Sequence, residues 1–178
     1  MSVVVGGRLA DTIITSDEDD SIFGRNGNDV IEANGGDDVI NAGAGSDRAS
    51  GGDGADSIFG RAGNDFLFGG RGNDLIDGGA GVDRISAQGG DDTVFGGGGN
   101  DVVRGGSGDD TIDGGAGHDR LLGNSGDDTI FGGNGNDTIF GGNGNDEIFG
   151  GVGKDEINGG AGADTMTGGA GQDKFIFD

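Results

Sequence analysis

Aspartate recurs at every ninth position along nearly the whole chain and could provide metal-binding chemistry. Carboxylate oxygens are ligands that hard divalent cations such as calcium prefer, whereas softer or nitrogen-preferring metals need Cys or His side chains. The chain has no Cys and a single His, His118. We therefore take the regular aspartates as candidate calcium ligands: Asp29, Asp38, Asp47, Asp56, Asp65, Asp74, Asp83, Asp92, Asp101, Asp110, Asp119, Asp128, Asp137, Asp146, Asp155, Asp164 and Asp173.

These aspartates are the sixth residues of a nine-residue unit that repeats 19 times, without insertion or deletion, from Gly6 to Ile176. The fourth residue of the unit is glycine in 17 units, and Leu9 and Glu18 are the exceptions. The eighth residue is a larger apolar one in 18 units, and Ala49 is the exception. The unit therefore reads G-G-x-G-x-D-x-U-x, where U is apolar.

The composition excludes several classes of protein. Only 30% of the 178 residues are hydrophobic and 48 are glycine, so an ordinary globular core is not expected. The absence of Pro and Cys argues against collagen and against a disulfide scaffold. The net charge of -23 favours cations as partners and disfavours nucleic acid and anionic membranes. No apolar run approaches the roughly 18 residues of a membrane-spanning helix.

The elements that must position the aspartates follow from the unit. Glycines at its first, second and fourth positions predict a turn over the first six residues, because glycine adopts positive φ without a steric clash. One apolar residue between two mostly polar ones predicts a strand over the last three residues. Since each turn reverses the chain, strands of units n and n + 2 should stack in parallel and form two sheets. We predict an all-β rod that is unstable without metal, because stacked aspartates repel.

This repeat resembles the RTX (repeats-in-toxin) family of calcium-binding nonapeptides. The resemblance implies a right-handed parallel β-roll (a β-helix, or solenoid) with two nonapeptides per coil, and calcium ions between turns n and n + 2. It also implies that one turn supplies its second and fourth carbonyls and its aspartate, and that the other supplies its first and third carbonyls and its aspartate. One such site would combine Gly115, Gly117 and Asp119 with Gly132, Asn134 and Asp137.

The same pattern gives at most 15 well-formed sites, counted as pairs of turns that both contain the fourth-position glycine. About twelve doubly charged ions would offset the net charge of -23. The turn residues that we assign as further ligands lie in five regular units: Gly96, Gly97, Gly98, Gly99, Gly105, Gly106, Ser107, Gly108, Gly114, Gly115, Ala116, Gly117, Gly132, Gly133, Asn134, Gly135, Gly141, Gly142, Asn143 and Gly144.

The regularity of the units divides the chain into three regions. Residues 1–23 are expected to form an N-terminal cap with two degenerate units, residues 24–176 the regular roll and residues 177–178 the C-terminal end. The acidic run 17–20 of the second unit fits either a solvated cap or an irregular calcium site. Five residues of the regular units replace the second glycine, a change that Asn tolerates better than Arg or Gln: Arg25, Asn34, Arg61, Gln88 and Asn124.

A longer period of 36 residues, or two coils, lies over the short one. At the ninth position it relates Phe23, Phe59, Phe95 and Phe131, and at the seventh it relates Arg48, Arg84 and Arg120. The spacing predicts straight ladders about 10 Å per step, with Phe on one sheet and Arg on the other. The Phe ladder fits a lateral contact with a protein or surface, or only the history of a duplicated block.

The sequence favours a non-catalytic function, because it offers one His and no Cys, and its aspartates already belong to the ladder. We expect His118 to be a solvated loop residue. The main hypothesis is a calcium-binding module that folds on binding, in an exported or cell-surface protein or as the non-catalytic module of one. Without an evident cleaved signal peptide, we expect an extracellular location reached by another route. The alternative is a structural or adhesive surface rod, of adhesin, surface-layer or ice-binding type, in which calcium is only structural.

Overall fold

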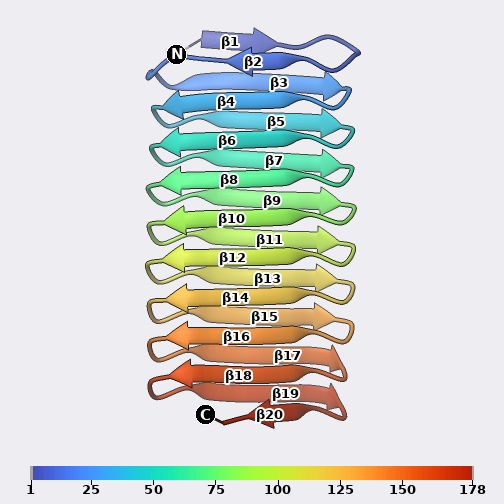
Figure 1. The fold of residues 1–178 in the computed structure, drawn as a ribbon, viewed down its shortest axis with the longest axis vertical. Coiled ribbons are helices and arrows are strands. Elements are labelled where there is room, and N and C mark those ends of the chain that lie inside the picture. Colours follow the sequence, from blue (N-terminus) through green and yellow to red (C-terminus); the bar gives the residue numbers. More distant parts are fainter. Residues whose placement is uncertain (1, 178) are drawn as a thin grey trace.

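In the computed structural model, which describes residues 2–177, the chain winds into a solenoid of two stacked parallel sheets (Figure 1). The odd-numbered strands form one ten-stranded sheet, here called the odd sheet: β1 (Ser2–Val5), β3 (Asp20–Asn26), β5 (Val39–Ala44), β7 (Ser57–Ala62), β9 (Leu75–Ala80), β11 (Thr93–Gly98), β13 (Thr111–Ala116), β15 (Thr129–Asn134), β17 (Glu147–Gly153) and β19 (Thr165–Gly171).

The even-numbered strands form the second ten-stranded sheet, here called the even sheet: β2 (Thr12–Ile14), β4 (Val30–Gly35), β6 (Arg48–Asp53), β8 (Phe66–Arg71), β10 (Arg84–Gly89), β12 (Val102–Ser107), β14 (Arg120–Ser125), β16 (Thr138–Asn143), β18 (Glu156–Ala161) and β20 (Lys174–Ile176).

The register of the sheets is that of the repeat. Each strand pairs in parallel with strands two elements away, and Ile112 of β13, for example, lies opposite Ile130 of β15, 18 residues later. Strands that are neighbours in the sequence run in opposite directions and belong to different sheets (Figure 1). The predicted all-β roll with two nonapeptides in each coil is confirmed.

The prediction of three-residue strands was wrong. Most strands are six residues long, because the sheet continues through the first three positions of the next unit, as in Thr111–Ala116. The turn is correspondingly short, and only Gly117, His118 and Asp119 separate β13 from β14. Identical units in register let even the glycine-rich part of one coil form backbone hydrogen bonds with the next coil. The glycines therefore belong to the sheets as well as to the turns.

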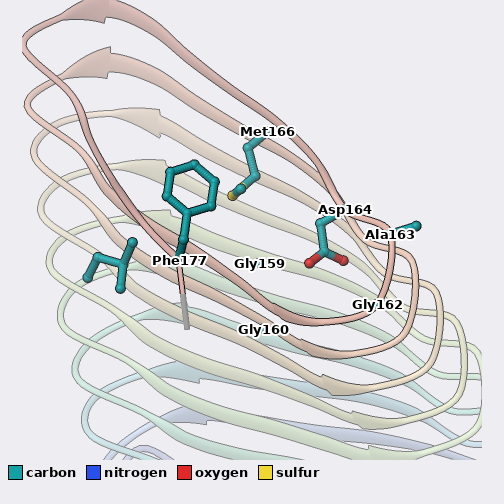
Figure 2. A pocket seen from close by; sticks show the side chains of 8 residues that line it. Gly159, Gly160, Gly162, Ala163, Asp164, Met166 and Phe177 are labelled. Carbon is teal, nitrogen blue, oxygen red and sulfur yellow. The ribbon is translucent and has the colours of Figure 1, made fainter.

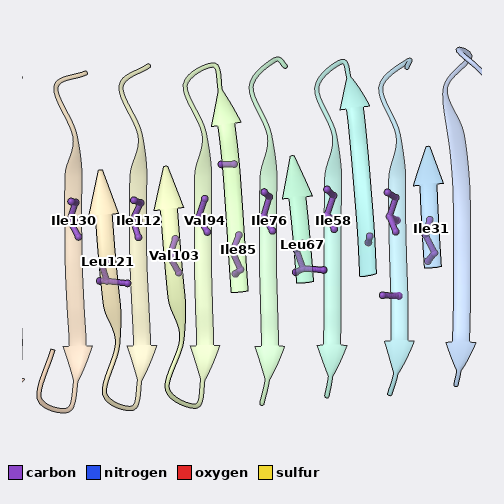
Figure 3. Close-up of a cluster of buried hydrophobic side chains, with 14 of the residues drawn as sticks. Ile31, Ile58, Leu67, Ile76, Ile85, Val94, Val103, Ile112, Leu121 and Ile130 are labelled. Atoms are coloured by element: carbon purple, nitrogen blue, oxygen red, sulfur yellow. The ribbon is translucent and has the colours of Figure 1, made fainter. Parts of the chain in front are cut away.

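The core is a single file of apolar side chains between the sheets. The eighth-position residues from Ile13 to Ile157 are buried. Figure 3 labels members of this file between Ile31 and Ile130, which enter the core alternately from the two sheets. The small first-position residues Ala33, Ala42 and Ala87 complete this core. The repeat did not predict β1, whose Val4 lies opposite Ile22 and packs against the core. Each rung therefore buries little apolar surface.

The glycine positions of the unit differ in what they require. Fourth-position glycines have φ between +104° and +153°, which L residues rarely adopt. The five residues that replace the second glycine have φ between +75° and +83°, so that position is left-handed without being restricted to glycine. First-position glycines do not have positive φ, contrary to the prediction. Glycine is favoured at the first position because neighbouring atoms occupy the space that a side chain would need. A Cβ on Gly114, for example, would lie 2.8 Å from Asp119 Oδ2.

Two adjacent glycines, Gly98 at the end of β11 and Gly99 in the turn that follows, allow a direct test of the need for glycine at the fourth position. A Cβ on Gly99, where φ is +144°, would overlap the carbonyl oxygen of Gly81, whereas a Cβ on Gly98 would meet nothing within 4 Å. We expect Gly99→Ala to destabilise the fold by about 1–3 kcal/mol or more, and to raise severalfold the calcium concentration needed for half-maximal folding in circular dichroism. The matched variant Gly98→Ala should behave like the wild type, and equal effects of the two would contradict this account.

Candidate metal centre

Sixth-position aspartates form a buried ladder along each edge of the solenoid. In 16 units, from Asp20 to Asp155, the residue is no more than 3% exposed. One carboxylate oxygen of each accepts a hydrogen bond from the backbone N–H of the residue 18 positions earlier, which is Ser2 for Asp20 and an aspartate for all the others. Asp101 thus donates to Asp119 Oδ1 at 2.8 Å, and Asp119 donates to Asp137 Oδ1 at 2.8 Å. The ladder ties each turn to the turn of the next coil.

The second oxygen, Oδ2, of the same 16 aspartates is buried without a hydrogen-bond partner. A buried polar atom without a partner costs about 1–3 kcal/mol, and more when it carries charge. An array of unpaired carboxylate oxygens is the set of ligands that a hard cation needs. The buried side chains therefore fit a cation that binds at repeated positions along both edges.

Backbone carbonyl oxygens and the unpaired Oδ2 atoms lie around the same glycines. Around Gly114, the carbonyl oxygen of Gly132 and Asp119 Oδ2 lie 2.7 and 2.8 Å from the point that a Cβ would occupy. The carbonyls of Gly115 and Gly117 are directed toward the α-carbons of the next coil, where a side chain would overlap them. These atoms come from turns n and n + 2, as the predicted site requires. The glycines keep the space around the carboxylates open to oxygen ligands.

Residues 2–177 bring no three His, Cys, Asp or Glu side chains together in a metal-binding cluster. The predicted ligand set is of a different kind, with two carboxylates and four backbone carbonyls per ion. Of these, the carbonyl of Asn134 also accepts a hydrogen bond from the N–H of Gly117 at 2.8 Å. The assignment of individual ligands stays a prediction.

The electrostatics of the ladder disfavour charge on the aspartates of the metal-free chain. Burial raises the pKa of the ladder carboxyls from Asp38 to Asp155, and neighbouring aspartates of the ladder raise many of them further. At the N-terminal end, the backbone hydrogen bond from Ser2 lowers the pKa of Asp20 instead. The pKa rises to about 7 for Asp74, Asp110 and Asp119. It rises to about 6 for Asp38, Asp47, Asp83, Asp92 and Asp128. Only the backbone hydrogen bond to each aspartate opposes this shift strongly.

Most predicted site residues lie where the repeat places them. The candidates from Asp29 to Asp155 are in the buried ladder, whereas Asp164 and Asp173, in the last coil, are half-buried. Asp20 is not among the predicted ligands because its unit is degenerate, yet its carboxylate is buried like the others. Its place at the sixth position of the unit was the signal that could have identified it. The predicted third-position residues, such as Ser107 and Ala116, are exposed, so only their carbonyls are available.

A second, outer ladder lies beside the first. His118 is exposed, as expected, but it is not free of contacts, because its Nδ1 accepts a hydrogen bond from the backbone N–H of Asn136 at 2.7 Å. Fifth-position Asn and Asp side chains make the same contact in other turns, as Asn100 does with His118. These side chains link successive turns on the surface and explain the frequency of Asn and Asp at the fifth position.

A surface hollow lies at the last coil, next to Met166 and Phe177 (Figure 2). Three glycines, Ala163, Ile176 and Asp164 line the rest of it, and Asp164 is the titratable side chain among them. The hollow therefore lacks the pair of titratable groups that acid–base catalysis uses. Within the described residues, no helix is long and apolar enough to cross a membrane.

Comparisons with known proteins address the repeat and the fold. A family model described as RTX calcium-binding nonapeptide repeat (4 copies) matches ten overlapping segments that together span residues 5–175. No curated protein matches the sequence significantly. A solved structure of a hyperactive, Ca2+-dependent, beta-helical antifreeze protein from an Antarctic bacterium is 18% identical, with a TM-score of 0.36, over 94% of this chain and 78% of that one.

Proposed function

The chain belongs to the family of RTX calcium-binding nonapeptide repeats, and from that premise we propose that calcium not only binds the β-roll but is required to fold it. The observation that carries this proposal is the row of 16 buried Oδ2 atoms without partners. Calcium would neutralise these carboxylates and would also be coordinated by backbone carbonyl oxygens, which no glycine side chain covers. The ion would thereby link turns that otherwise share little packing.

The proposed sites lie between turns of successive coils on the same edge. Asp119 and Asp137 would bind one ion together with carbonyls of their turns, and each aspartate would bridge two ions along the edge. We propose up to about 15 ions for the regular units. Asp20 extends the same buried geometry into the second unit.

We further propose an extracellular role for the chain, as an exported or cell-surface protein or as the non-catalytic module of one. Extracellular calcium modules bind at about 10⁻⁴ to 10⁻³ M, so such sites are empty in a cytosol and filled outside the cell. An acidic, glycine-rich chain without its ions does not bury enough apolar surface to fold. Export in the unfolded state followed by folding in calcium is consistent with both properties.

A calorimetric calcium titration tests the sites. We expect Asp119→Asn, which keeps an acceptor for the Asp101 N–H but loses the charge, to remove about two ions and to weaken calcium-induced folding. The matched control is Asp109→Asn, which has the same charge change at an exposed fifth position. An unchanged stoichiometry in Asp119→Asn would contradict bridging aspartates. Binding without any gain of structure would contradict folding by calcium.

A further inference from the structure

The outer faces of the two sheets carry opposite charges over the middle of the rod. Between β9 and β17, the charged side chains that project from the odd sheet are acidic: Asp77, Asp113 and Glu147. Between β10 and β14, those of the even sheet are basic: Arg84, Arg104 and Arg120. We propose that the odd sheet of one molecule stacks face to face on the even sheet of a second copy of this chain.

These charges are not neutralised within one chain. The ion pairs of the described residues are Arg71 with Asp53 and Lys174 with Glu156, and both lie outside the set above. Arg84 and Arg120 instead lie over the rings of Phe66 and Phe140, at 5.3 and 4.8 Å from the ring centroids. Each guanidinium is thus held against the sheet by an aromatic ring while its charge remains available to a partner.

The two faces share one spacing. Asp77 and Asp113 are separated by 36 residues, as are Arg84 and Arg120, so both pairs repeat every two coils, or about 9.6 Å. Asp77 and Arg84 belong to the same coil, because they lie on consecutive strands. A second copy displaced sideways, without a shift along the rod, therefore brings the acidic rungs level with the basic ones. Once one contact forms, the next is in register.

The shapes of the faces also match. On the odd sheet, Phe95 lies between Asp77 and Asp113 on adjacent strands and is 41% exposed. On the even sheet, a shallow hollow is lined by Phe66, Phe68, Ser86, Arg84 and Arg104. A ring flanked by two carboxylates complements an aromatic hollow flanked by two guanidinium groups. Stacking would cover a phenylalanine that is otherwise exposed to water.

The area of the faces suffices for a stable contact. The eight six-residue strands of the even sheet, β4 to β18, lie about 4.8 Å apart with about 3.3 Å per residue, and so present about 760 Å². This is close to the about 800 Å² per partner of a standard interface. Contacts between like faces would bring acid against acid or arginine against arginine. Odd-on-even stacking uses two different faces, so it is open-ended and leads to stacks of rods rather than to closed dimers.

Charge reversal on each face tests the stacking by sedimentation velocity in calcium. One variant reverses the even face (Arg84→Glu with Arg120→Glu) and the other reverses the odd face (Asp77→Arg with Asp113→Arg). We expect each variant alone to need about tenfold or more protein for half-association, because like charges then face each other. An equimolar mixture should restore association, because each reversed face then meets an oppositely charged one. The control Arg8→Glu with Lys154→Glu has the charge change of the even-face variant at exposed turn residues and should associate like the wild type.

The inference rests on the proposed calcium-dependent fold, since only the folded rod has these faces, but the two fail separately. Circular dichroism of each variant in calcium reports the fold alone and should match the wild type. If a reversed variant does not fold, Arg84→Gln with Arg120→Gln takes its place, and weaker association is expected. A folded wild type that stays monomeric, variants that associate normally, or a mixture that does not associate would overturn the stacking and leave calcium-dependent folding intact.

Discussion

In excess chelator the chain is expected to lose the β-sheet signal of far-UV circular dichroism, and calcium at about 10⁻⁴ to 10⁻³ M is expected to restore it. Two stacked aspartates about 4.8 Å apart repel by about 3.5 kcal/mol at an effective dielectric constant near 20. This repulsion recurs at every rung of both edges. Against it each rung buries only one larger apolar side chain, such as Ile112 or Leu121. The metal-free ladder should therefore unfold the rod as a whole.

Magnesium and sodium chloride are the controls for this experiment. Magnesium requires near-ideal octahedral geometry and gives up its water reluctantly, so it should restore little structure at the same concentration. Salt at matched ionic strength should screen the repulsion without linking the turns. A chain with the same β-sheet signal in chelator and in calcium would show that the core and the backbone hydrogen bonds suffice, and would contradict calcium-dependent folding.

The periodicity of the sequence determined most of the fold. A single register of nine residues placed the eighth-position side chains from Ile13 to Ile157 in the core and paired each strand with the one 18 residues away, because a solenoid repeats its contacts with its sequence. At the last coil, where no further coil covers the end, Met166 is only partly buried and Phe175 is exposed. The strand length could not be predicted in the same way. Glycine disfavours strands when it is considered alone, and only the parallel neighbours of the stacked coils supply the hydrogen bonds that hold residues such as Gly115 in the sheet.

The chemistry of the site was predictable only in part. The repeat identified the sixth-position aspartates, but it did not show that Oδ1 would join the backbone of the next coil while Oδ2 remained unpaired. It also assigned the first glycine to positive φ, whereas the structure shows that this glycine leaves space beside the carboxylate. Both features depend on the distance between coils, which a sequence pattern does not contain.

Acid is expected to substitute in part for calcium. In the metal-free chain the pKa values of Asp74, Asp110 and Asp119 are raised to about 7, from the ordinary value of 3.8. At pH values between the ordinary pKa and the raised pKa, the folded chain binds more protons than the unfolded chain. The stability of the folded chain therefore rises as the pH falls from about 7 toward 4. We predict that the chelated chain gains β-sheet signal when the pH is lowered from about 8 to 5, because protons neutralise the ladder.

A triple variant separates this effect from a general response to acid. In Asp74→Asn with Asp110→Asn and Asp119→Asn, an amide replaces the carboxyl groups with the most raised pKa, and the variant should need less acid to fold and should bind fewer calcium ions. In calcium, the wild type should show the opposite pH dependence to its metal-free form, since protons compete with the ion for the same oxygens and weaken binding as the pH falls. Because the isoelectric point is about 4.1, dilute samples at pH 5 and above keep the measurement clear of precipitation. A chelated chain that is equally unfolded at pH 8 and pH 5 would mean that charge neutralisation alone contributes little, and that calcium folds the rod mainly by linking its turns.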